Sequence, residues 1–68
     1  MKEKIERALF EARPYIEYYE ELKRKVEEIG SKVQDEASFI QLVEEEIKSS
    51  REPFKTDLKI FLQKFSSL

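Results

Sequence analysis

The sequence has 68 residues, of which 13 are basic and 15 acidic, and it contains neither cysteine nor histidine. Disulfide scaffolds, zinc modules and histidine-based catalysis are excluded, because each needs a residue type that the chain lacks. The mixed charges form no large basic field for nucleic acid, and no apolar run approaches the roughly 20 residues that cross a bilayer. We therefore expect one cytoplasmic domain over residues 1–68, without metal or cofactor. The many Lys and Glu residues are typical of hyperthermophile proteins.

Apolar residues recur at steps of three and four along nearly the whole chain, which is the pattern of amphipathic helices. Written as the a and d positions of a heptad, the repeat is that of a coiled coil or helical bundle. Alternation with period two is nowhere sustained, so strands are not expected. The repeat predicts an all-α fold with core positions at Ile5, Leu9, Ala12, Ile16, Tyr19, Val26, Val33, Ala37, Ile40, Ile47, Phe54, Leu58, Phe61, Phe65 and Leu68.

The first predicted helix spans about residues 2 to 29. Pro14 falls on its outward face, and the preceding Arg13 is a poor N-cap for a new helix. These features favour a kink at Pro14 within one continuous helix over a true break. Tyr15 and Tyr19 would then lie in the core or at its edge.

A turn is predicted at Gly30, the only glycine. Glycine can adopt the left-handed conformation that closes a helix, and Ser31 with Gln34 has the spacing of a capping box. The second helix then spans about residues 32 to 50.

Pro53 ends the second helix, because it lacks a backbone donor and disfavours helix at the residue before it. The third helix, about residues 53 to 67, either folds back or continues the second helix past a kink. Its stripe of Phe54, Phe61 and Phe65 is expected to close the protein's own core. A membrane surface or a partner's groove is the alternative for this stripe.

These elements define an antiparallel helical hairpin with a third C-terminal helix. The apolar stripe of the first helix is three positions wide, which favours packing against at least two neighbours and predicts a homo-oligomer, either a dimer or a tetramer. Polar residues interrupt the repeat at Lys23, Glu44 and Arg51. Polar residues at such core positions often specify register and oligomer number.

Phe39 and Leu42 lie off the predicted stripe and three residues apart, so they are neighbours on one helix. One interpretation is a patch that docks another protein. The other is ordinary packing in an oligomer, or a heptad frame that does not fit this helix.

No motif for catalysis or cofactor binding is present, and the glutamate-rich runs are typical of solvated helix faces. The sequence therefore predicts a protein–protein interaction module, such as an adaptor, regulatory subunit or chaperone, without enzymatic activity. The alternative is a nucleic-acid-binding regulator built as a helical hairpin dimer, with Lys23–Lys25 as the nearest basic cluster. Binding to membranes is not expected.

Overall fold

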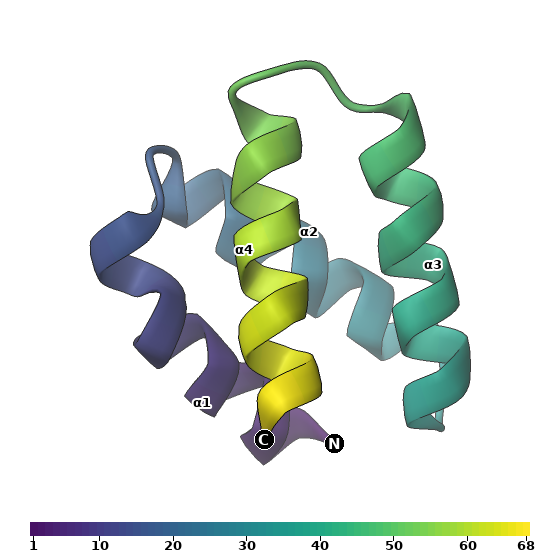
Figure 1. Cartoon of the computed structure of the whole chain (residues 1–68). Coiled ribbons are helices and arrows are strands. Elements are labelled where there is room, and N and C mark those ends of the chain that lie inside the picture. The colour runs from purple at the N-terminus through teal and green to yellow at the C-terminus, as the bar shows by residue number, and fades with distance from the viewer.

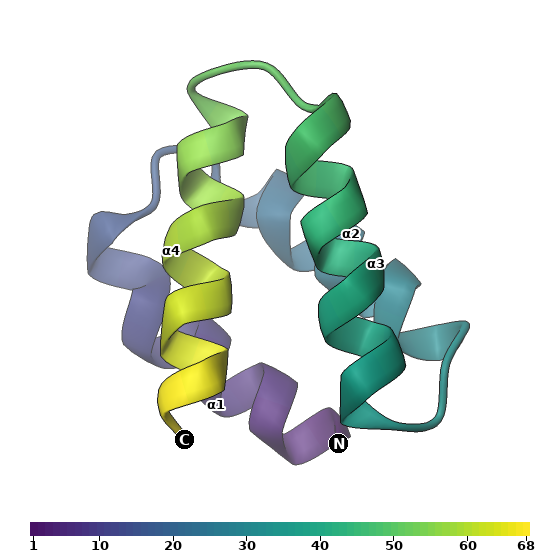
Figure 2. The ribbon, with the colours of Figure 1, turned by 45° about the vertical axis from the view of Figure 1, so that its right-hand side comes forward.

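Four α-helices form the structure, a computed structural model that describes residues 1–68. They are α1 (Lys2–Ala12), α2 (Tyr19–Ser31), α3 (Glu36–Ser49) and α4 (Phe54–Ser67), with a short 3-10 turn, η1 (Arg13–Tyr15), between the first two. The chain reverses between α3 and α4, which lie side by side, while α2 runs behind them (Figures 1 and 2). Helix α1 makes its most extensive contact with α4. The all-α prediction is confirmed, although the chain contains four helices where three were expected.

The prediction of one kinked helix over residues 2 to 29 is wrong, because the chain breaks fully at Pro14. Helix α1 ends at Ala12, η1 follows, and Ile16 is extended with φ −99° and ψ 133°. Proline supplies no N–H for the helical bond to Phe10, which weakens the helix at this point. Residues 2–31 therefore contain two separate helices, α1 and α2.

Gly30 does not form the predicted turn. It lies inside the last turn of α2 and has no left-handed backbone conformation. A Cβ atom at this position would lie only 2.8 Å from Cδ1 of Ile5. Glycine is therefore suited to this site because α1 packs closely against α2, and not because the backbone needs special freedom.

Helix α3 begins at Glu36, four residues later than predicted, and Ser31 and Gln34 do not cap it. Its N-cap is Asp35, whose carboxylate accepts hydrogen bonds from the N–H of Ser38 at 2.9 Å and from its hydroxyl at 2.9 Å. The Ser38 amide and then its hydroxyl lower the pKa of Asp35, because both bonds favour the charged carboxylate.

Helix α4 begins within one residue of the predicted start. Glu52 accepts hydrogen bonds from the hydroxyl and the N–H of Thr56 at 2.6 and 2.9 Å, which holds the first turn. The hydroxyl bond is the main reason that the pKa of Glu52 is lowered. The helix folds back along α3, so it does not continue α3 past a kink.

A single apolar core joins all four helices. Its centre holds three phenylalanines: the Phe39 ring lies 4.9 Å from that of Phe65 and 6.1 Å from that of Phe61. The core consists of Ile5, Ala8, Leu9, Leu22, Val26, Ile29, Phe39, Val43, Leu58, Phe61 and Phe65. The expectation that the phenylalanines of the last helix close the protein's own core holds for Phe61 and Phe65, while Phe54 is half-buried.

The heptad frame is wrong over α3. Phe39 is completely buried and Leu42 is half-buried, so the two residues do not form an exposed docking patch. The predicted heptad frame runs unbroken through residues 32–35, which are not helical. Helix α3 therefore has a different set of inward-facing positions from those that the frame predicts. Phe39 and Val43 face inward as a consequence.

The three polar residues at predicted core positions are all exposed. Lys23 lies on α2, Glu44 lies on α3, and Arg51 lies in the connection before α4. None of them faces the core of this chain, and their role in specifying an oligomer stays a prediction. Tyr15, expected at the core edge, is exposed as well, whereas Tyr19 is half-buried against the core.

Candidate functional site

Exposed aromatic side chains gather where α1 gives way to α2. Four large apolar or aromatic residues of the chain are exposed, and three of them, Phe10, Tyr15 and Tyr18, lie at this place. Phe10 is 76% exposed and Tyr15 is 63% exposed. An open hollow beside them is lined by Phe10, Glu11, Arg13, Pro14, Tyr15 and Lys64. We call this region the joint surface.

Local backbone structure explains why these side chains point outward. Ala8, Leu9 and Ala12 occupy the inward face of α1, which leaves Phe10 on the opposite face. The break at Pro14 then takes the chain out of helix before Tyr15 can reach the core. Phe10 is thus exposed because it lies on the outer face of α1, and Tyr15 is exposed because the helix breaks at Pro14.

Asp57 connects α4 to the backbone segment that precedes α2. Its two carboxylate oxygens accept hydrogen bonds from the N–H of Glu17 at 3.1 Å and from the N–H of Tyr18 at 2.9 Å. These amides precede α2, and no helical carbonyl is placed to accept from them. Asp57 is only 3% exposed and is the one buried charged residue. A side chain from α4 therefore anchors the backbone that leads into α2.

Two cations of the joint region lie over aromatic rings. The Arg13 guanidinium is 4.8 Å from the ring centroid of Tyr19, and the Lys64 ammonium is 5.1 Å from that of Tyr15. Neither cation forms an ion pair, whereas the one carboxylate that lines the hollow, Glu11, pairs with Arg7 at 3.5 Å. The joint surface thus combines apolar rings with cations that have no carboxylate partner.

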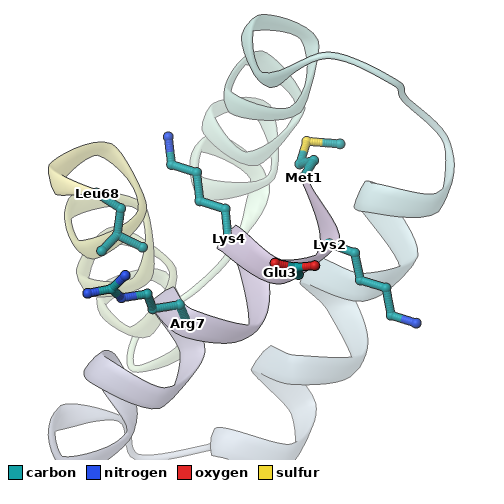
Figure 3. Close-up of a pocket in the computed structure, with 6 residues that line it drawn as sticks. All are labelled: Met1, Lys2, Glu3, Lys4, Arg7 and Leu68. Carbon is teal, nitrogen blue, oxygen red and sulfur yellow. The ribbon is translucent and has the colours of Figure 1, made fainter.

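A second hollow lies between the start of α1 and the end of α4 (Figure 3). It holds Lys2, Lys4 and Arg7, but the side chains of Lys2 and Lys4 point away from each other (Figure 3). Lys4 pairs with Glu36 at 2.8 Å and lies 4.6 Å from the ring of Phe65, and Arg7 pairs with Glu11. Two of the three cations are therefore already partnered, and the three do not converge on one point.

The basic run Lys23–Lys25 does not form an unpaired patch either, because Lys25 lies 3.4 Å from Glu28 and 3.9 Å from Glu46. No three acidic side chains are grouped closely enough to hold a metal ion. None of the four helices is both long and apolar enough to cross a membrane.

Phe10 and Tyr18 lie off the predicted apolar stripe, and the sequence pattern did not predict the joint surface. The sequence feature that could have predicted this surface is that Phe10 and Tyr18 both lie close to Pro14. This feature is informative only if the helix breaks at Pro14. Asp57 gave no usable signal, since an aspartate in a first helical turn is common and its partners lie about 40 residues away in sequence.

The chain is thus a small all-α protein of four packed helices with an exposed aromatic surface at one joint. It belongs to the MJ1579 family, whose sequence profile matches residues 2–68. The family description states no activity, ligand or partner. No curated protein matches the chain.

Proposed function

We propose that the protein is a non-catalytic protein–protein interaction module and that the joint surface is its contact site. The observation that carries this proposal is the exposure of Phe10, Tyr15 and Tyr18 within one short segment, in a chain whose other large apolar side chains, except Leu68, are buried or half-buried. Aromatic residues are enriched at protein interfaces and dominate the binding energy there.

The rigidity of the joint supports the same proposal. The N–H groups of Glu17 and Tyr18 donate hydrogen bonds to Asp57, and these bonds restrain the segment between α1 and α2 together with the fixed φ of Pro14. A surface that is ordered before binding loses less conformational entropy when a partner arrives. Adaptor, regulatory-subunit and chaperone roles all use such a surface.

Self-association, which the sequence predicted, is not part of this proposal. The width of the apolar stripe predicted an oligomer, but of the four residues that make the stripe wide only Tyr15 is exposed, whereas Ala8, Leu22 and Ile29 are buried within the chain itself. A role in nucleic-acid binding has no supporting observation of this kind, since the basic residues are dispersed or paired.

Site-specific photo-crosslinking in the native host tests the proposed function. A photoreactive phenylalanine analogue replaces Phe10 in one variant and replaces Gln41, an exposed residue of α3, in the control variant. We expect a discrete crosslinked protein from position 10 that is absent from position 41 and is lost when Tyr15→Ala is added. No product, or the same products from both positions, would contradict the proposal.

A further inference from the structure

The aromatic part of the joint surface is smaller than the interface that two folded copies of this chain would need. At about 200 Å² per aromatic side chain, the exposed parts of Phe10, Tyr15 and Tyr18 amount to roughly 350 Å². A stable interface buries about 800 Å² on each partner, which is about a sixth of the 4656 Å² surface of the chain. The dimensions fit a short peptide segment better than a second globular protein.

The charges at the joint determine whether the bound segment should be acidic or basic. Arg13 and Lys64 lie over Tyr19 and Tyr15, where each keeps donor hydrogens free of any carboxylate. The carboxylate of Glu11 is directed to Arg7. A ligand carboxylate can therefore bind these cations without breaking an ion pair of the protein, whereas a basic ligand would meet two like charges.

Attraction of an acidic ligand is local and not a property of the whole molecule. The chain carries a net charge of −2, which does not favour acidic partners at long range. At an ionic strength near 0.1 M, charges farther apart than about 10 Å are largely screened, so Arg13 and Lys64 act on a ligand at the joint more strongly than distant carboxylates do. Symmetric pairing of two joint surfaces is disfavoured for the same reason, because it brings the cations of both copies together.

From these observations we infer that the joint surface binds a short acidic peptide segment of a partner protein, with an apolar side chain over Phe10 and Pro14 and carboxylates on Arg13 and Lys64. The inference rests on the proposed function and adds the chemical class of the partner. The aromatic rings supply the contact area, and the two cations supply the preference for acidic sequence.

A titration followed by NMR tests the inference. The probes are two capped peptides of equal length with the same leucine and phenylalanine positions, in which the remaining residues are all glutamate or all lysine. We expect the glutamate peptide to shift the backbone amide resonances of residues 10–18 of the labelled chain. Two exposed charge pairs should make it bind about tenfold more tightly than the lysine peptide.

Matched variants identify the residues responsible. Arg13→Gln with Lys64→Gln should reduce the preference to about threefold or less, whereas Arg24→Gln, which removes an exposed cation elsewhere on α2, should leave it unchanged. Circular dichroism confirms that each variant is folded. Equal binding of both peptides, or tighter binding of the lysine peptide, would overturn the inference.

The two proposals fail in different ways. If neither peptide binds while crosslinking at position 10 still captures a protein, the acidic class of the partner is wrong and the interaction site stands. If neither peptide binds and no crosslink forms, both proposals are wrong. Shifts that are equally large in the Phe10→Ala and Tyr15→Ala double variant would also overturn the inference, since binding would then lie elsewhere.

Discussion

Asp57 is the residue on which the connection between α1 and α2 depends most. Its carboxylate satisfies two backbone donors from a segment that lies about 40 residues earlier in the chain. It also lies in the first turn of α4, where a negative charge interacts favourably with the helix dipole. One side chain thus stabilises the starts of two helices.

Replacement of Asp57 by alanine should destabilise the fold by about 2 to 4 kcal/mol, because two amide groups lose their acceptor. Asp57→Asn keeps the shape and one acceptor oxygen, so it should cost less. Urea unfolding followed by circular dichroism measures both values. Wild-type stability in the alanine variant would show that water replaces the carboxylate without loss.

The caps at Asp35 and Glu52 predict how stability depends on pH. Both groups have a lowered pKa in the folded chain, so each contributes stability above its ordinary value, 3.8 or 4.5, and this stability is lost as pH falls through the lower folded values. The melting temperature should therefore fall on acidification, and the fall should be smaller in the Asp35→Asn and Glu52→Gln double variant. Glu44→Gln, which alters an exposed glutamate without a capping bond, should retain the wild-type fall.

Helix boundaries were the part of the structure that the sequence predicted least well. The period of the apolar residues correctly gave helices throughout, and Pro53 correctly marked the start of α4. Pro14 offered two outcomes, a kink or a break, and the choice depended on Asp57, whose hydrogen bonds stabilise the broken form. Such a contact between distant residues leaves no trace in local sequence.

The error in the core of α3 has a related cause. A heptad frame holds only within one continuous helix, and here it was extended across residues 32–35. The displaced frame moved Phe39 from the core to a supposed surface and placed Glu44 inside. The predicted docking patch at Phe39 and Leu42 is wrong for this reason. The joint surface was not predicted either, because it depends on the three-dimensional arrangement of α1, η1 and α4.

Pro14→Ala should reduce the free energy of unfolding by about 0.4 to 1 kcal/mol, since the 3-10 turn already suits proline and alanine adds conformational freedom to the unfolded chain. A kink inside one continuous helix would give the opposite sign, because alanine would restore a backbone hydrogen bond. Chemical denaturation distinguishes the two. A clear gain in stability would show that the break at Pro14 is strained.

Phe39→Ala should cost about 3 to 5 kcal/mol, like Phe61→Ala, because both rings lie in the centre of the core. Phe10→Ala removes the same side chain from the surface and should change stability by less than about 0.5 kcal/mol. Thermal and urea unfolding of the three variants provide the comparison. A mild effect at Phe39 together with a large one at Phe10 would contradict the arrangement of α1 and α3.

At the scale of the whole molecule, the chain covers its own apolar stripe. The four helices surround one core, and three of the four exposed large hydrophobic side chains lie at the joint. No polar side-chain atom is buried without a hydrogen-bond partner. The features that favoured an oligomer in the sequence are thus accounted for within a single chain.

Sedimentation equilibrium should therefore show a monomer of 8.2 kDa at micromolar concentration. A stable dimer or tetramer would contradict this prediction and restore the oligomer that the stripe width suggested. Repeating the run with the Phe10→Ala and Tyr15→Ala double variant would then show whether the copies meet through the joint surface.

The packing of α1 against α4 also determines when the protein can fold during synthesis. On the ribosome, α1 emerges before the side chains that cover it, including Phe65, have been made. The nascent chain must therefore keep Ile5 and Leu9 uncovered until α4 has left the ribosome. Partial helices can form earlier, yet the core can close only in one late step. Ribosome-bound chains that end before α4 should accordingly remain sensitive to protease along their whole length.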